Sequence, residues 1–160
     1  MAAIAVTGTP GTGKTELSKE LAKQLGYKYI DVNKIIKKED LEESYDKKRD
    51  TYVVDAKKLS KALDKCIKEN KDVVIDSHMS HEADPKLIDW CIVTKCDTDV
   101  LRERLKKKGY NSEKVQENID AEILDICREE AARYDHKILV VDTTKKTPKK
   151  LAVQLKKLLA

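Results

Sequence analysis

Short apolar runs alternate with segments of helical period along the whole chain of 160 residues. The first apolar run, at residues 3–6, is typical of a buried strand. It is followed, at residues 15–25, by leucine and alanine at the three- and four-residue spacing of an amphipathic helix. The chain therefore begins with a strand that leads through a short loop into a helix.

The same two patterns predict the remaining elements. Strands are expected at residues 27–30, 72–76, 89–93 and 137–141. Helices are expected at residues 32–38, 55–69, 99–108, 112–134 and 148–159, and a charged stretch without a predicted element runs through residue 50. Strands separated by helices favour parallel pairing with helices on both faces. We therefore predict an α/β three-layer sandwich around a five-stranded parallel sheet.

The loop after the first strand carries a phosphate-binding motif. Its sequence from Gly8 to Thr15, G-T-P-G-T-G-K-T, fits the pattern G-x-x-x-x-G-K-[ST]. In such a loop, backbone N–H groups converge on phosphate oxygens, Lys14 reaches the β- and γ-phosphates, and the Thr15 hydroxyl is placed on Mg²⁺. A turn rich in glycine and threonine could match by chance, but the flanking strand and helix favour the functional interpretation. The predicted nucleotide-binding residues of the loop are Gly8, Pro10, Gly11, Thr12, Gly13, Lys14 and Thr15.

Carboxylates follow other predicted strands at their carboxyl ends, which is where ligands bind in open parallel sheets. Asp76 comes directly after the apolar residues 73–75, and Asp31 follows the second strand. A carboxylate in the position of Asp76 holds Mg²⁺ in phosphate-loop enzymes. A helix-capping role for Asp76 is the alternative. The strand-end position favours the metal.

Histidines lie close to this carboxylate. His78 follows Asp76 by two residues, and its near-neutral pKa suits the positioning or deprotonation of a water or hydroxyl group. A hydrogen-bonded loop histidine is an equally open interpretation. His81 is less well placed, and we expect it to be structural or on the surface.

A basic helix and turn follow the fourth strand. Arg102 and Arg104 are two positions apart and cannot share a helix face, so only one is expected to point at a nucleotide. Lysines at 106–108 precede a turn at 109–111, an arrangement that could close over phosphates as a lid. A solvated basic face is the alternative. The loop at residues 142–146 could hold a nucleobase through backbone groups.

Composition narrows the class of protein. Charged residues make up 39% of the chain, but the signs nearly cancel to a net charge of +4, so no nucleic-acid partner is demanded. The four cysteines are scattered without a C-x-x-C pair, which favours reduced thiols over a zinc site. We see no run of eighteen apolar residues and no basic secretory leader. These features predict a cytoplasmic protein without membrane spans.

Three segments together resemble the small archaeal and eukaryotic nuclear-type adenylate kinases. They are the run from Gly8 to Thr15, the triplet from Asp76 to His78, and Arg104-Leu105 followed by K-G-Y-N at residues 108–111. The resemblance covers nearly the full length and includes residues 26–32 and 45–55. It implies one P-loop nucleotide kinase domain over residues 1–160, with a region that binds the nucleoside monophosphate at about 31–54 and a short lid at about 107–117.

The resemblance also implies an activity and partners. Members transfer phosphate between ATP and AMP, hydrolyse ATP, and act in late maturation of the small ribosomal subunit. There they bind a ribosomal protein of the subunit platform, which allows an indirect contact with RNA. ATP and Mg²⁺ are the implied cofactors, and ATP, ADP and AMP the implied small-molecule partners.

The implied site extends beyond the loop. The catalytic residues would be Lys14, Asp76, His78 and Arg104, and Thr15 and Asp76 would hold the metal. Lys108 and Lys146 would join the loop in binding ATP, and Asp31 and Lys37 would bind AMP.

The chain departs from the family pattern at three positions. Glu16 stands where many members have a second threonine, although its backbone N–H can still point at the α-phosphate. Lys37 and Lys108 stand where arginine is expected, and lysine cannot reproduce the bidentate fork of arginine on phosphate. We therefore predict that ATP hydrolysis is retained and that the kinase rate is modest. An ATPase assembly factor with a negligible kinase role remains an alternative, as does a shikimate-type or other small-molecule kinase.

Overall fold

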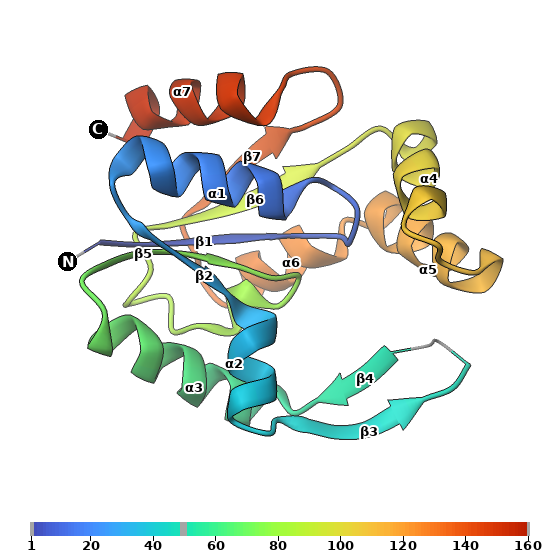
Figure 1. Ribbon diagram of the computed structural model, residues 1–160, viewed down its shortest axis with the longest axis horizontal. Coiled ribbons are helices and arrows are strands. Elements are labelled where there is room, and N and C mark those ends of the chain that lie inside the picture. Colours follow the sequence, from blue (N-terminus) through green and yellow to red (C-terminus); the bar gives the residue numbers. More distant parts are fainter. Residues whose placement is uncertain (1, 49–50, 160) are drawn as a thin grey trace.

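The computed structural model describes residues 2–48 and 51–159, and a single parallel sheet of five strands lies at its centre (Figure 1). The strand order across the sheet is β2-β5-β1-β6-β7. The strands are β1 (Ala2–Gly8), β2 (Lys28–Asp31), β5 (Asp72–Asp76), β6 (Trp90–Lys95) and β7 (Ile138–Asp142). All four neighbouring pairs are parallel, which confirms the predicted five-stranded sheet.

Helices cover both faces of the sheet. On one face lie α1 (Lys14–Leu25) and α7 (Pro148–Leu159), which pack against each other. On the other lie α2 (Val32–Lys38), α3 (Ala56–Glu69) and α6 (Ile126–Arg133). Side chains of β1 alternate between these two cores, because successive residues of a strand point to opposite faces. The predicted three-layer α/β sandwich is confirmed.

The central strand is almost completely buried. Ala5 and Val6 have no exposed surface, and Leu17 and Leu21 of α1 are nearly as deep. Burial of one such leucine contributes about 1.5–3 kcal/mol to folding. The end of β1 is therefore a rigid base for the loop that follows it.

Two expectations from composition can be compared with the structure. All four cysteines are free thiols, as their scattered positions predict. Within residues 2–48 and 51–159, no helix combines the length and the apolar character that crossing a bilayer requires.

A β-hairpin occupies the charged stretch for which no element was predicted. It consists of β3 (Glu42–Asp46) and β4 (Thr51–Val54), paired antiparallel, with Arg49 and Asp50 outside the described residues. The rings of Tyr45 and Tyr52 meet across the two strands, with their centroids 5.1 Å apart. Because most of the hairpin side chains are polar and exposed, the apolar alternation that identifies a strand is absent.

The long helix predicted at residues 112–134 is wrong. The chain forms α5 (Ser112–Ile123) and then α6, with a break at Asp125, whose φ of 58° is left-handed. Lys95 holds this break through an ion pair of 2.8 Å from its Nζ to Asp125 Oδ1. No glycine or proline marks the break, so periodicity alone runs through it.

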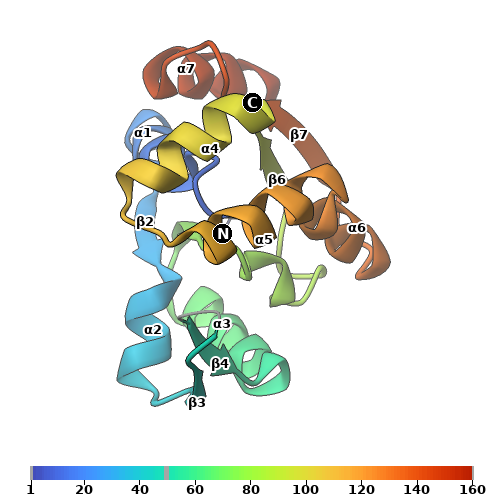
Figure 2. The same ribbon diagram turned by 90° about the vertical axis from the view of Figure 1, so that its right-hand side faces the viewer.

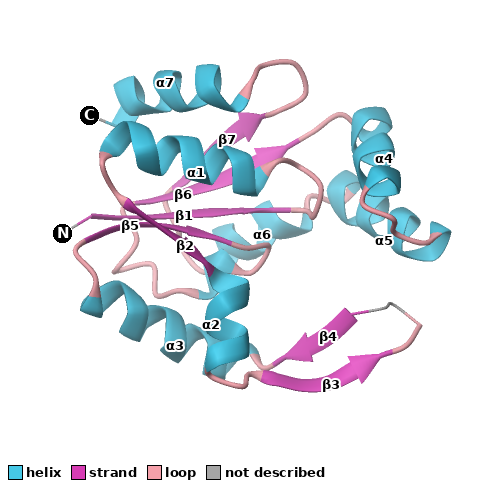
Figure 3. Cartoon of the chain, in the orientation of Figure 1, coloured by secondary structure: helices cyan, strands magenta, loops and turns pink. Residues whose placement is uncertain are grey.

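One end of the sheet carries the remaining elements. The strands point their carboxyl ends toward α4 (Thr98–Lys107), α5 and the β3–β4 hairpin (Figures 2 and 3). The helices α4 and α5 share a small core of their own, and Gly109, with a φ of +81°, follows the end of α4 as the sequence predicts. Residues far apart in the sequence thus surround the loop after β1.

Candidate functional site

The loop after β1 needs glycine at positions where both space and backbone conformation are restricted. Gly8 and Gly11 have φ values of +147° and +91°. A Cβ atom at Gly8 would lie 2.3 Å from Thr94 Oγ1, and one at Gly11 would lie 2.8 Å from Leu101 Cδ1. The loop is therefore packed tightly against β6 and α4, and side chains are excluded from its inner side.

Hydrogen bonds within the loop fix its curvature. The Thr9 carbonyl accepts from Thr12 N at 3.2 Å, Thr12 Oγ1 at 2.6 Å and Lys14 Nζ at 3.1 Å. The Thr12 carbonyl accepts from Thr143 Oγ1 at 2.6 Å. Helix α1 begins at Lys14, and its N-cap, Gly13, provides no side-chain cap. The first N–H groups of the helix and its dipole can therefore face an anion.

Lys14 places a cation beside this helix end. Its side chain is buried, and desolvation lowers its pKa to about 8, although the negative charge of Asp76 opposes the shift. A buried ammonium group is stabilised when an anion replaces lost water. A phosphate that enters the site would therefore stabilise the charged form of Lys14.

Oxygen atoms suited to a magnesium ion lie next to Lys14. Asp76 at the end of β5 is 4% exposed, and its Oδ2 accepts from Thr15 Oγ1 and from the Tyr29 hydroxyl, both at 2.7 Å. Desolvation and the hydrogen bond to Asp76 raise the pKa of Tyr29, so this hydroxyl stays a donor. A carboxylate and a hydroxyl oxygen in contact are the donor set that Mg²⁺ prefers. The residues Thr15 and Asp76 therefore fit the ion.

The two histidines near Asp76 have different environments. His78 is exposed on a cavity wall, where desolvation by the surrounding protein and the charge of Lys14 lower its pKa. The imidazole of His78 is therefore neutral and can accept a hydrogen bond from a water or hydroxyl group, although it is a weaker base than a free histidine. His81 is 1% exposed, with Nδ1 2.8 Å from Thr7 Oγ1 and Nε2 2.7 Å from Glu130 Oε2. It is structural, in line with the expectation for this residue.

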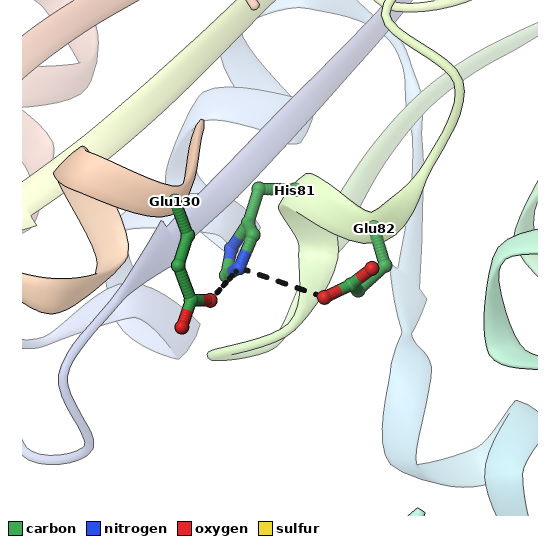
Figure 4. Close-up of side chains that lie close together, drawn as sticks. All are labelled: His81, Glu82 and Glu130. Carbon is green, nitrogen blue, oxygen red and sulfur yellow. Dashed lines mark hydrogen bonds and ion pairs between the residues drawn. The ribbon is translucent and has the colours of Figure 1, made fainter. Parts of the chain in front are cut away.

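Carboxylates surround the outer nitrogen of His81 (Figure 4). Glu82 and Glu130 approach it from the short 3₁₀ helix η1 (Ser80–Glu82) and from α6, and one ligand atom from each of the three side chains lies within 4.8 Å of the other two. This spacing could admit a cation. The hydrogen bond from His81 to Glu130 links η1 to α6.

Arg104 and Arg102 differ as their spacing predicts. Arg104 donates to Thr143 Oγ1 at 3.1 Å, to the Thr143 carbonyl at 3.0 Å and to the Gly11 carbonyl at 3.5 Å. Arg102 instead donates to Gln116 Oε1, at 3.4 Å. Arg104 thus connects α4 with the phosphate-binding loop and with the loop after β7, whereas Arg102 lies on the outer side.

Two cavities flank the phosphate-binding loop. One, of about 640 Å³, is lined by the loop, α4 and the start of α7. The other, of about 580 Å³, is lined by the ends of β2 and β5, the hairpin and α5. Each has the volume of a small-molecule site. Three side chains line both cavities: Lys14, Thr15 and Lys108.

The predicted site residues divide between these cavities. The first cavity contains Gly11, Gly13, Glu16, Arg104 and Lys146. The second contains Pro10, Asp31, Asp76 and His78. Gly8 and Thr12 support the loop from beneath, in contact with Thr94. Lys37 is exposed in the last turn of α2, outside both sets of lining residues.

Sequence reasoning missed one buried carboxylate. Glu122 is 5% exposed, and its Oε1 accepts from Thr9 Oγ1 in the phosphate-binding loop at 3.0 Å. It follows Val115 and Ile119 on the buried stripe of α5. A charged residue at an apolar position of a helix pattern is the signal that could have identified it.

Comparisons with known proteins agree with this geometry. A family model described as an AAA domain matches residues 4–125. A protein of Methanocaldococcus jannaschii named "Putative adenylate kinase" is 44% identical over 141 residues, which cover 88% of this chain and 76% of the relative. A protein of the same name from Methanosarcina acetivorans is 38% identical over 98% of this chain and 85% of the relative.

Solved structures share the fold. Shikimate kinase from Acinetobacter baumannii, in complex with shikimate, has a TM-score of 0.69 at 14% identity, over 99% of this chain and 93% of that one. Deoxyadenosine kinase from M. mycoides with bound dATP has a TM-score of 0.60 at 18% identity, over the whole of both chains. The architecture is therefore the α/β P-loop kinase fold.

Proposed function

The chain belongs to the family of the AAA-domain model and is a relative of the archaeal proteins named "Putative adenylate kinase". We propose that it is a Mg²⁺-dependent adenylate kinase that also hydrolyses ATP. It would convert ATP and AMP into two molecules of ADP. The proposal treats residues 1–160 as one nucleotide kinase domain.

The observation that carries this proposal is the pair of cavities that meet at Lys14, Thr15 and Lys108. A phosphoryl group passes between two substrates only when both lie in line at one point. We assign ATP to the cavity beside Arg104 and Lys146, and AMP to the cavity beside Asp31. The region at about 31–54 would then enclose AMP, and the lid at about 107–117 would close over the phosphates.

The chemistry follows from the charges at the meeting point. The Lys14 ammonium and the first N–H groups of α1 would stabilise the negative charge of the transferring phosphoryl group. Thr15 and Asp76 would hold Mg²⁺, which when bound neutralises charge on the phosphates. Arg104 positions the loop from α4, and Lys108 would contact phosphate from the lid side. His78, neutral on the cavity wall, would orient or deprotonate a hydroxyl group or a water.

A second role, ATP hydrolysis without AMP, is favoured by the lining of the cavity assigned to AMP. His78 is exposed to the second cavity, and Lys37 does not line it, so water could take the place of AMP. On this view the protein is an ATPase assembly factor of the cytoplasm that acts in small-subunit maturation. It would bind a platform ribosomal protein and contact RNA only indirectly, with phosphate state biasing its affinity for the partner.

An assay of ADP and phosphate released from ATP, with and without AMP, separates these roles. In the wild-type protein, a dominant kinase produces ADP only when AMP is present. A dominant ATPase releases phosphate without AMP and loses that activity in His78→Ala. Absence of both products from a protein that folds and binds Mg²⁺-ATP would reject the proposed enzyme.

A further inference from the structure

Glu122 joins the lid side of the molecule to the phosphate-binding loop. It lies near the end of α5, and both its carboxylate oxygens have partners outside that helix. Oε1 accepts from Thr9 Oγ1 at 3.0 Å, and Oε2 accepts from the backbone N–H of Cys96 at 2.9 Å. A buried carboxylate is costly to desolvate, and these contacts offset that cost.

A cation anchors the same carboxylate at the break between α5 and α6. Lys95 Nζ lies 3.2 Å from Glu122 Oε1, donates to the Glu122 carbonyl at 3.0 Å and to Asp125 Oδ1 at 2.8 Å. Desolvation opposes the charge of Lys95, but its two acidic partners prevail and raise its pKa. The break is therefore a fixed point on the end of β6 rather than a loose joint.

Thr9 connects Glu122 with Lys14 in the phosphate-binding loop. Its hydroxyl donates to Glu122, while its carbonyl accepts from Lys14 Nζ and from both donors of Thr12. Thr9, which holds Lys14 in place, is thus held in turn by Glu122 at the break between α5 and α6. A change in the Glu122 contact would move the Thr9 carbonyl and with it the ammonium group.

We propose that Glu122 is a positioning residue that keeps the phosphate-binding loop in its nucleotide-binding form from the break between α5 and α6. This inference rests on the proposed phosphate-transfer function. The contact would hold Thr9, and through it Lys14, in the position that binds the phosphates. Glu122 touches no reacting atom, and its effect passes through Thr9.

Thr9→Val tests the link with little disturbance of the fold. Valine keeps the shape of threonine and removes only the hydroxyl donor, while Glu122 retains Cys96 N–H and Lys95. We expect ADP affinity and turnover each to fall about tenfold or more, since small misplacements of catalytic groups have effects of this size or larger. Thr9→Ser, which restores the hydroxyl, should return both close to wild type at an unchanged melting temperature.

Glu122→Gln provides the partner variant, with Glu129→Gln on the exposed face of α6 as its matched control. Glutamine has one acceptor oxygen, whereas the two carboxylate oxygens of Glu122 face Thr9, Cys96 and Lys95. We expect at least the loss seen in Thr9→Val, and no further loss when Thr9→Val is added to Glu122→Gln. Glu129→Gln should behave as wild type.

Calorimetry with ADP, steady-state kcat and KM, and thermal melting should be measured together. Unchanged affinity and turnover in Thr9→Val, or a lowered melting temperature as the sole effect, would overturn the positioning role. Calorimetry with ADP reports loop geometry even if the wild type transfers no phosphate to AMP. The experiment can therefore reject the positioning role of Glu122 separately from the proposed kinase function.

Discussion

The two cavities that meet at Lys14 are built in different ways. The cavity assigned to ATP is bounded in part by Thr143, which is 7% exposed and donates to the carbonyl of the buried Thr12 in the phosphate-binding loop. The cavity assigned to AMP reaches the β3–β4 hairpin at Thr51, and the next two residues of the hairpin, Tyr52 and Val53, are 56% and 45% exposed. The cavity assigned to ATP, the donor side, is thus preformed. The hairpin beside the cavity assigned to AMP, the acceptor side, packs little against the core. Binding at the acceptor side would have to order more of its own wall.

The largest effect is expected where the donor side is most tightly packed. Gly8→Ala would place a methyl group 2.3 Å from Thr94 Oγ1 and 2.8 Å from the Thr94 carbonyl oxygen, at a φ of +147°. We expect the free energy of unfolding to fall by about 3 kcal/mol or more, and ATP binding to be lost. Urea unfolding and calorimetry with ATP measure both.

Gly26→Ala is the matched control for this substitution. Gly26 also has a positive φ, of +71°, but an added methyl group there would meet no atom within 4 Å. Only the backbone strain remains, at about 1 kcal/mol, and ATP affinity should not change. Equal losses in the two variants would show that the packing of Gly8 has no special role.

Arg104 provides a smaller test of the donor side. Arg104→Lys loses the fork that reaches Thr143 through two hydrogen bonds, and a lost hydrogen bond to a charged group costs about 1.5–3 kcal/mol. We expect ATP affinity to fall about tenfold or more. Arg102→Lys on the outer side of the same helix should leave affinity unchanged, and a similar loss in both variants would contradict the assignment.

The pH dependence of binding should report on Lys14. Its pKa of about 8 means that the free protein loses the ammonium charge above that pH, whereas a bound phosphate retains the proton. Affinity for ATP should therefore fall by up to about tenfold per pH unit above pH 8.

The free energy of unfolding should change with pH in the opposite direction because of the same lysine. The unfolded chain keeps its proton up to about 10.5, so the contribution of Lys14 to stability rises between pH 8 and 10.5. Calorimetry with ATP and urea unfolding over this range measure the two slopes. A flat affinity profile would contradict the assigned role of Lys14.

The smallest effect is expected on the acceptor side. Tyr52→Ala removes the ring contact with Tyr45, and such pairs contribute about 0.5–1.5 kcal/mol. We expect global stability to change by less than about 1 kcal/mol because the hairpin is peripheral, with a modest rise in the KM for AMP and unchanged ATP affinity. Loss of ATP affinity in this variant would erase the contrast between the two sides.

The sequence predicts those parts of the site that depend on consecutive residues or on strand ends. The motif from Gly8 to Thr15 and the position of Asp76 follow from a local pattern and from parallel topology. Glu122 could not be predicted as a partner of Thr9, because a separation of 113 residues is closed only by tertiary packing. The break at Asp125 likewise depends on Lys95, a residue of another element. Local pattern thus identifies the chemistry, and packing decides how it is held.

The central claim is that the two cavities meet at Lys14, so that ATP and AMP can be bound side by side. A bisubstrate analogue, in which a polyphosphate joins two adenosines, would have to cross Lys14 to fill both cavities. Its binding should be measured by calorimetry, alone and in competition with ATP and with AMP. We predict one analogue bound per chain, more tightly than ATP and in competition with both nucleotides. Binding no tighter than that of ATP, with AMP unable to compete, would contradict the account.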